Sequence, residues 1–509
     1  MQQAKRVAKN TGILYVQMAI TVTMSLYATR LILAALGAED FGVFNVVGGA
    51  IAMLTFLNSA MTTASQRFMS FAQGQGDFKK QKTIFNVSTL LHFCIATILV
   101  VLLELVSGFL FDGILKISPD RIEVAKTIYQ FLIFSTFFTL ISVPYDAVIN
   151  AHENMLLVAI LRIIEVVLKL GIAILIGFLS IDRLYIYGLL MAILTVSLFF
   201  IRVIYCHKNY EEVTIGVKKY YNKTTFKEMT SFAGWSLLSS SASMLTMQGM
   251  TILINSFFGV IVNAAQGIAL QITGQIMAFS NTMLKALNPL IVKSEGENNR
   301  EKMLKASMTG NKLSFLLLAF FSIPAIIEMP YILSLWLKDV PEFAIIFCRL
   351  NLFRSTLTQL TVTFPTAIGA TGKIKESQLI ESIIWILLLP VSYIMFKNGA
   401  RPETIYINLI FMVIALSFSR IYFAHRVCGM SIKSYINRVV LRGAGVFLFT
   451  ATLSFLPLLI FSEGFLRLIS VLVISSVSFI LSVVVIGLES TEKTLVLALW
   501  KGLLLKIRK

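Results

Sequence analysis

The sequence predicts an all-α, polytopic membrane protein with about fourteen transmembrane helices, arranged as two pseudo-symmetric six-helix bundles and two additional C-terminal helices. Composition, the spacing of apolar runs and an internal repeat support this prediction. Of the 509 residues, 57% are hydrophobic and only 14% are charged, whereas soluble proteins carry about 45–50% apolar and roughly 25% charged residues. The mean hydropathy of +0.82 indicates lipid as the solvent. Water-soluble enzymes, nucleic-acid-binding proteins and secreted disulfide scaffolds are therefore excluded.

Apolar runs separated by charged or turn-rich breaks mark the expected spans. The runs lack the alternation of a membrane barrel, and only helices or closed barrels satisfy the backbone within hydrocarbon. The expected helices are 11–36, 41–64, 84–111, 125–148, 154–178, 184–206, 231–257, 260–290, 310–336, 343–371, 377–396, 403–424, 441–461 and 466–487.

Basic residues are concentrated in the breaks that fall on one side of these spans. That side carries thirty Lys and Arg residues, including those of both termini, and the other side carries seven. Because basic loops stay in the cytoplasm, both termini are expected there, which also requires an even number of spans. The breaks on the other side are short, the longest being 112–124, so no folded catalytic domain is expected outside.

An internal repeat relates the two halves of the chain at one constant offset. Gly12, Gly37 and Gly74 recur as Gly234, Gly259 and Gly296, at equivalent places relative to the span ends. A repeat of six spans keeps the same topology in both copies, so the copies are related by an axis along the membrane normal. The expected organisation is a first bundle 1–206, a basic linker 207–230, a second bundle 231–424, two further helices within 425–487 and a basic amphipathic tail 488–509.

No residue pattern in the chain indicates an enzyme. The four histidines are isolated, the four cysteines lack metal-binding spacing, and GATGK at 369–373 lacks the spacing of a phosphate-binding loop. We therefore expect a non-enzyme with no metal and no cofactor, other than coupling to an H⁺ or Na⁺ gradient.

Charged residues inside the spans are the candidate functional groups, because each costs about 2.5–3.5 kcal/mol to insert. Six are basic and are predicted to line a cationic central cavity that binds substrate: Arg30, Arg162, Lys169, Lys285, Arg349 and Arg354. Four are acidic, namely Glu104, Glu165, Glu328 and Glu381, of which Glu104, Glu165 and Glu381 are the candidates for ion coupling.

Each candidate also has a structural interpretation. Glu165 lies one turn from Lys169 and three residues from Arg162, so these three can neutralise one another within one helix. Arg30 and Lys285 can extend to the membrane interfaces, and Glu104 and Glu381 can pair between helices. Arg354 has no acidic neighbour in its own span, which makes it the strongest functional candidate. Because basic residues outnumber acidic ones, the interior favours an anion, and guanidinium groups suit phosphate oxygens especially well.

Several segments resemble a known family. The first span, LGAEDFGVF at 36–44 and FAQGQGDFKK at 71–80 are similar to those of bacterial polysaccharide (O-antigen-type) flippases of the multidrug/oligosaccharidyl-lipid/polysaccharide exporter (MOP) superfamily. Many relatives have Pro where this chain has Ala38. The resemblance covers the length and the six-plus-six-plus-two plan, but its motifs are structural and assign no individual substrate-binding residue.

The resemblance implies transfer of an undecaprenyl-pyrophosphate-linked oligosaccharide, an O-antigen or capsular repeat unit, across the bacterial inner membrane by alternating access. The expected partners are this lipid-linked oligosaccharide and membrane lipids, with the polysaccharide polymerase and chain-length machinery as candidate protein partners and no nucleic acid. A cation-coupled multidrug exporter of the same superfamily is the main alternative. A membrane polysaccharide polymerase or glycosyltransferase, and a scaffolding protein without transport activity, are further alternatives.

Overall fold

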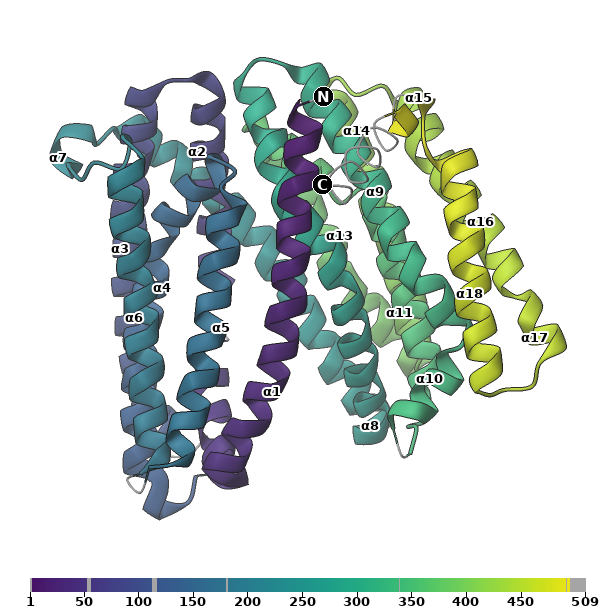
Figure 1. Cartoon of the computed structure of the whole chain (residues 1–509), viewed down its shortest axis with the longest axis horizontal. Helices are drawn as coiled ribbons and strands as arrows, with labels where there is room; N and C mark the ends of the chain where they lie inside the picture. Colours follow the sequence, from purple (N-terminus) through teal and green to yellow (C-terminus); the bar gives the residue numbers. More distant parts are fainter. Residues whose placement is uncertain are drawn as a thin grey trace, which may run out of the picture. The chain divides into compact units, whose positions relative to one another are not determined.

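The computed structural model describes residues 2–52, 56–111, 117–179, 182–337, 339–490 and 492–494, and these residues are almost entirely helical (Figure 1). No strand occurs in the described ranges. The all-α class is therefore confirmed. Most of the tail expected at 488–509 lies outside the described residues, as does part of the break at 112–124.

The first half of the chain forms long helices joined by short connections. Asp77, Asn154 and Asp182 precede three of them and accept hydrogen bonds from backbone N–H groups of the first turn, as good N-caps do. The elements are α1 (Gln2–Ala52), α2 (Phe56–Gln75), α3 (Phe78–Phe109), the 3₁₀ turn η2 (Pro119–Arg121), α4 (Ile122–Ala151), α5 (Met155–Gly177), α6 (Arg183–Asn209) and α7 (Val217–Tyr220).

The second half begins with a 74-residue helix and contains more breaks. Proline at the start of α10, α12 and α17 accounts for three of the new starts, because proline fits the first turn but not the interior of a helix. The elements are α8 (Lys223–Gly296), α9 (Arg300–Ile327), α10 (Met329–Trp336), α11 (Ala344–Gln359), α12 (Phe364–Ala370), α13 (Lys375–Lys397), α14 (Thr404–Cys428), α15 (Ile432–Tyr435), the π turn η3 (Ile436–Val440), α16 (Leu441–Ser454), α17 (Leu456–Ile460), α18 (Phe465–Ser482) and the π turn η4 (Val483–Gly487).

Helices α1 and α8 each consist of two helices that meet at a glycine. Gly37 has φ 80° and ψ 170°, and Gly259 has φ 79° and ψ −173°. Other residues rarely adopt a positive φ, so glycine is required at both bends. Because Gly37 and Gly259 are equivalent positions of the internal repeat, the same backbone geometry recurs at the same place in its two copies.

By length and hydropathy, ten helices of the described residues can cross a membrane. Two of the expected spans, 231–257 and 260–290, lie in the single helix α8. Helix α5 has the length of a span but contains three charged residues, Arg162, Glu165 and Lys169. The span expected at 343–371 is divided between α11 and α12.

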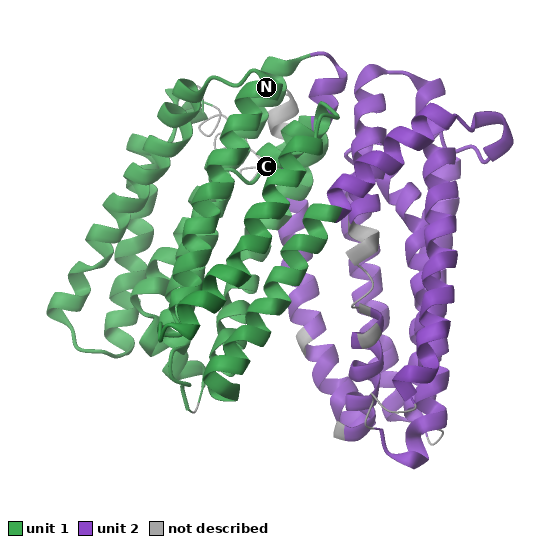
Figure 2. Ribbon diagram, turned by 180° about the vertical axis from the view of Figure 1, so that it is seen from behind, with its two compact units in different colours: residues 1–8, 238–291, 299–509 green, residues 9–237, 292–298 purple. Residues whose placement is uncertain are grey.

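The chain forms two compact units (Figure 2). Unit 2 contains Lys9–Leu237 and Val292–Asn298. In it α4 packs against α2, α3 and α6, and buried side chains such as Val47, Leu99 and Tyr129 form its core. Since lipid is as apolar as these side chains, close packing rather than escape from water stabilises this core.

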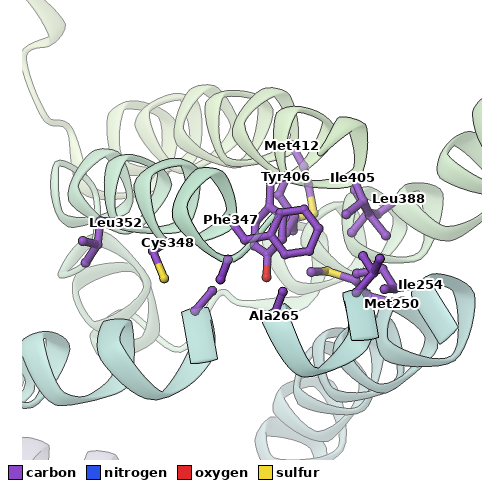
Figure 3. Close-up of a cluster of buried hydrophobic side chains, with 14 of the residues drawn as sticks. Met250, Ile254, Ala265, Phe347, Cys348, Leu352, Leu388, Ile405, Tyr406 and Met412 are labelled. Carbon is purple, nitrogen blue, oxygen red and sulfur yellow. The ribbon is translucent and has the colours of Figure 1, made fainter. Parts of the chain in front are cut away.

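Unit 1 contains Met1–Ala8, Leu238–Ile291 and Asn299–Lys509. One core of this unit lies among α8, α11, α13 and α14 and includes Phe347, Leu388 and Tyr406 (Figure 3). A second cluster packs α16 and α18 against α9, through Phe315, Val446 and Phe479. The two additional C-terminal helices are thus part of this unit.

Within unit 2, the last turn of α8 crosses the end of α2 at two glycines. A Cβ atom on Gly74 would overlap the carbonyl oxygen of Lys293, and one on Gly296 would overlap the carbonyl oxygen of Phe71. Lys293 and Gly296 are the repeat equivalents of Phe71 and Gly74. The crossing is therefore reciprocal, because each copy of the repeat makes the same contact with the other.

Candidate functional site

The side chain of Arg354 is held in unit 1 by neutral groups. Its Nε donates to Oδ1 of Asn351 at 2.9 Å, and one terminal nitrogen donates to Oγ of Ser355 at 3.0 Å. Asn351 is fixed in turn by donating to Oγ1 of Thr273 at 2.9 Å. Among the described residues, no carboxylate lies within ion-pair distance of Arg354. It lies ten residues into the 16-residue α11, or about 15 Å along the helix, and its positive charge has no described carboxylate to compensate it there.

A row of buried polar side chains, which we call the polar ribbon, continues along α11 from Arg354. Ser280 on α8 donates to Oε1 of Gln359 at 2.8 Å, and Asn311 on α9 accepts from the backbone N–H and hydroxyl of Thr363 at 2.8 and 2.9 Å. These four residues have 0% exposure. Sequence reasoning missed the ribbon, although the spacing of Asn351, Ser355 and Gln359 on one face of α11 is a signal that could have revealed it.

Tyr406 adds a second polar group near Arg354. Its ring packs against Phe347, with centroids 4.7 Å apart, and its hydroxyl points toward Ala265 of α8 (Figure 3). The side chain is fully buried, and its hydroxyl makes no hydrogen bond to any described residue. A buried hydroxyl without a partner is costly, so Tyr406 carries an unsatisfied polar group within the apolar core of unit 1.

The other two predicted basic residues of unit 1 have different surroundings. Arg349 donates to the carbonyl oxygens of Ile326 and Ile327 at 2.8 and 3.2 Å, where α9 ends. This guanidinium therefore satisfies carbonyl groups that have no partner within the helix. Lys285 is exposed on α8.

In unit 2, Arg162, Glu165 and Lys169 lie along one face of α5. The carboxylate of Glu165 accepts from Arg162 at 3.1 Å and from Lys169 at 2.8 Å. The intrahelical cluster that the spacing predicts is thus present. One carboxylate faces two cations, so the cluster keeps a net positive charge. Arg30 is exposed on α1, and no ion pair of its side chain occurs among the described residues.

The three acidic residues predicted to couple an ion gradient all accept hydrogen bonds. Glu165 belongs to the α5 cluster. Glu381 on α13 is 6% exposed and forms a two-fold contact with Arg420 on α14, with both N–O distances 3.1 Å. Glu104 on α3 is exposed and accepts from Gln130 at 3.1 Å. Glu165 and Glu381 are thus engaged with cations.

Several ion pairs join segments far apart in the sequence and were not predicted, among them three that involve largely buried charges. Arg467 contacts fully buried Glu328 at 2.9 and 3.1 Å. Lys312 contacts Glu492 at 2.5 Å, and Arg202 contacts Asp146 at 3.0 Å. The sequence offers no local signal for such pairs because their members lie on different elements. They account for several charges that would otherwise be candidates for a substrate site.

A cluster of three polar side chains, Glu212, His152 and Tyr210, lies outside the membrane-spanning helices. Two of them belong to the segment between α6 and α7. Glu212 is 2% exposed and contacts Nε2 of His152 at 2.5 Å. The ring of Tyr210 stacks on His152 with centroids 4.3 Å apart. Burial opposes the charge of Glu212, but hydrogen bonds from His152 and the backbone, together with the charge of Lys82, hold the pKa of the Glu212 carboxyl below its usual value. Burial raises the pKa of the Tyr210 phenol.

Residues 15–175 match the MatE family model, which is less than half of the chain. No curated protein matches the sequence.

Solved structures of transporters match most of the chain in fold. An outward-facing multidrug resistance MATE family transporter of the MOP superfamily has a TM-score of 0.73 at 13% identity, covering 84% of this chain and 96% of the other. A MOP superfamily transporter from Pyrococcus furiosus has a TM-score of 0.69 at 14% identity, covering 84% of this chain and 97% of the other. It is described as having a binding pocket of reverse polarity that suggests a different function. The MATE transporter ClbM in complex with Rb⁺ has a TM-score of 0.69 at 14% identity, covering 85% and 96%. Identities this low concern the fold alone, and the chain therefore has the fold of the MATE transporters of the MOP superfamily.

Proposed function

We propose that this protein is a membrane exporter that works by alternating access. The fold of MATE transporters over 84% of the chain supports this proposal, as does the MatE match at 15–175. The proteins named in these comparisons are transporters, so the polymerase or glycosyltransferase alternative receives no support from them.

The comparisons favour a multidrug exporter over a lipid-linked oligosaccharide flippase, because a structural neighbour is described as a multidrug resistance transporter. A cation-coupled multidrug exporter is therefore the first of two candidate substrate classes. It predicts carboxylates that are free to bind an organic cation. In this chain Glu165 and Glu381 are engaged with arginine or lysine instead.

The charge distribution favours the second class, an anionic amphiphile such as an undecaprenyl-pyrophosphate-linked oligosaccharide. The observation that carries this proposal is Arg354, whose guanidinium is held by Asn351 and Ser355 and by no described carboxylate. The net positive cluster of Arg162 and Lys169 around Glu165 also favours an anionic substrate. A guanidinium can contact two phosphate oxygens at once, which suits a pyrophosphate head group. The transporter from Pyrococcus furiosus is a precedent within this superfamily for a pocket of reversed polarity.

We further propose that Arg354 binds the anionic head group in unit 1, and that Arg162 and Lys169 offer a separate anion-binding group in unit 2. In this proposal Arg30 and Lys285 assist, and Arg349 mainly fixes the end of α9. The proposed location is the bacterial inner membrane with both termini in the cytoplasm. An H⁺ or Na⁺ gradient would drive transport, and the polysaccharide polymerase and chain-length machinery would receive the product.

Deletion of the gene in the source strain separates the two substrate classes. A flippase deletion should cause lipid-linked oligosaccharide to accumulate on the inner leaflet and should reduce surface polysaccharide, while susceptibility to cationic drugs stays unchanged. A multidrug exporter deletion should increase susceptibility to cationic drugs and leave the glycolipid unchanged. Complementation with the wild-type gene is the control, and a strain unchanged in both measurements would contradict both proposals.

A further inference from the structure

A buried polar chain joins α2 and α3 in unit 2 and ends at a histidine. The hydroxyls of Ser65 and Ser88 are 2.8 Å apart, and Nδ1 of His92 is 2.8 Å from the Ser88 carbonyl oxygen and 3.3 Å from its hydroxyl. Ser65 and His92 have 0% exposure and Ser88 has 1%. His92 follows the first residue of the 32-residue α3 by fourteen positions, which places it about 21 Å along a helix about 48 Å long.

The hydrogen bonds define the tautomer of His92. A carbonyl oxygen only accepts, so the short contact with Ser88 requires a proton on Nδ1. In the neutral ring the lone pair is then on Nε2. Nε2 is buried and has no hydrogen-bond partner among the described residues. A buried acceptor left unpaired costs about 1–3 kcal/mol, so a purely structural role would not explain the choice of histidine.

Among the described residues, no charged or titratable side chain is a partner of the His92 ring. Helix α1 shares a core with α3, and none of its ionisable residues forms a described hydrogen bond or ion pair with His92; these are Arg6, Lys9, Tyr15, Tyr27, Arg30, Glu39 and Asp40. The helices that pack most extensively against α3 are α2, α4 and α7. None of their charged or titratable residues, nor those of α3 itself, forms a hydrogen bond or ion pair with His92 in the described structure. These residues are Arg67 on α2, Glu123, Lys126, Tyr129, Tyr145 and Asp146 on α4, Lys218, Lys219 and Tyr220 on α7, and Lys79, Lys80, Lys82, Cys94 and Glu104 on α3.

We infer that His92 is a proton-binding residue of the transport cycle, with Nε2 as the atom that takes the proton. This inference rests on the proposed exporter function and gives its gradient coupling a chemical group. Of the acids predicted to couple, Glu165 and Glu381 already hold cations, whereas Nε2 of His92 has a free lone pair.

Protonation of His92 requires a change of conformation. A hydronium ion gives its proton to the lone pair of Nε2, so that one O–H bond breaks, an N–H bond forms and water is released; the neutral imidazole becomes an imidazolium with no change of oxidation state. An isolated charge in an apolar interior is very unfavourable, so the protonated ring needs water or an acceptor at Nε2. Because Ser88 connects the ring to Ser65, movement that opens the ring to water changes the packing of α2 on α3.

The variant His92→Asn tests this inference with little structural change. An asparagine amide can occupy the position of Nδ1 and donate to the carbonyl four residues earlier, as Asn86 and Asn150 do in this chain at 2.8 Å. It cannot take a proton at the position of Nε2. His92→Gln is the second variant, in case the first does not fold. His207→Asn, at an exposed position near the end of α6, is the matched control.

Two measurements on the full-length protein in lipid nanodiscs, without transport substrate, test the inference. Nitrogen NMR of ¹⁵N-histidine-labelled protein should show a ring that changes from the neutral to the protonated form as the pH is lowered and that is absent from His92→Asn. Hydrogen–deuterium exchange, corrected for intrinsic rates, should show faster exchange of α2 and α3 peptides in the wild type and His207→Asn at low pH, but no such change in His92→Asn.

A His92 ring that stays neutral down to the lowest pH at which the protein remains folded would overturn the inference, as would a pH response that persists in His92→Asn. Neither measurement depends on a transported molecule. A failure of the deletion experiment would therefore count against the proposed function, and a failure here would count against His92 alone.

Discussion

Arg354 and Arg349 show how two arginines five residues apart on one helix can have different roles. Arg349 is bound by the carbonyl groups at the end of α9, whereas Arg354 contacts an amide and a hydroxyl that leave its charge uncompensated. From sequence alone, both residues are candidates for the cationic cavity, with Arg354 the stronger of the two. Only the contacts separate a residue that stabilises a helix end from one that is available to an anion.

Replacement of Arg354 tests the anion site. Arg354→Gln should abolish surface polysaccharide while the protein level in the membrane stays normal, because an amide cannot supply the charge. Arg354→Lys should retain part of the function, since lysine keeps the charge but loses the two-fold geometry. Surface polysaccharide staining and immunoblots of membranes provide the measurements. Arg426→Gln is the control, because this arginine pairs with Glu376 and both side chains are more than half exposed. Normal display in Arg354→Gln would contradict the assignment.

The pair Glu328–Arg467 allows a second test at this scale. Glu328→Gln should lower the free energy of unfolding by about 3–5 kcal/mol, because the largely buried guanidinium of Arg467 loses its close carboxylate. Only the half-exposed Glu463, at 3.9 Å, then remains beside it. The side chains of Glu328 and Arg467 are only 0% and 13% exposed, so solvent screens the pair weakly. Thermal unfolding in detergent measures the effect. Glu123→Gln, in an exposed pair with Lys126, should change stability by about 0.5 kcal/mol or less.

The double variant Glu328→Leu, Arg467→Leu should recover much of the stability lost in Glu328→Gln, since apolar replacements remove both charges together. If Glu328→Gln melts at the wild-type temperature, α18 is held to the rest of unit 1 mainly by the apolar contacts around Phe479.

At the scale of the element, the crossing of α2 and α8 requires glycine at positions 74 and 296, where any side chain would overlap the backbone of the other helix. Gly74→Ala and Gly296→Ala should each lower stability by about 1–3 kcal/mol, because the added methyl group meets a backbone oxygen that cannot rotate away. Thermal unfolding of the two variants in detergent measures the loss.

The repeat supplies a matched pair of controls for this prediction. Gly12 and Gly234 are also equivalent positions of the repeat, but an added Cβ meets nothing within 4 Å at either position. Alanine there should be neutral or should stabilise its helix by about 0.5–1 kcal/mol. An equal loss of stability in all four variants would mean that the crossing is not the cause.

At the scale of the whole molecule, the distribution of basic residues predicts the orientation. In a background without the four native cysteines, Lys218→Cys should react with a membrane-impermeant maleimide only after the cells are opened. Lys397→Cys should react in intact cells. Both positions are exposed in the structure, so poor accessibility within the protein cannot account for a difference. The opposite labelling pattern would reverse the proposed topology.

The sequence was most informative about two kinds of feature: contacts between neighbours on one helix, and properties that depend on the composition of long segments. Composition predicted the membrane helices, and the spacing of Arg162, Glu165 and Lys169 predicted their mutual contacts, because neighbours on one helix turn are fixed by helix geometry. The glycine repeat placed Gly37 and Gly259 at equivalent span ends, but it did not predict the bends that the structure shows there.

Contacts between helices could not be predicted from the sequence. Glu381 pairs with Arg420 and Glu328 with Arg467 because of how the helices pack, and no sequence offset encodes that packing. The polar ribbon was not predicted for the same reason. Its members are ordinary side chains in apolar segments, and only their common burial makes them a single feature.

At Gly37 and Gly259 the backbone angles, and not a lack of space, disfavour an L-residue with a side chain. Space around both α-carbons is open to 4 Å, so bulk alone does not exclude a side chain. Reflecting their angles of φ 80° and 79° gives values close to the extended polyproline region that L-residues favour. A D-alanine introduced at either bend by protein semisynthesis would therefore be relaxed, whereas its L-enantiomer would be strained.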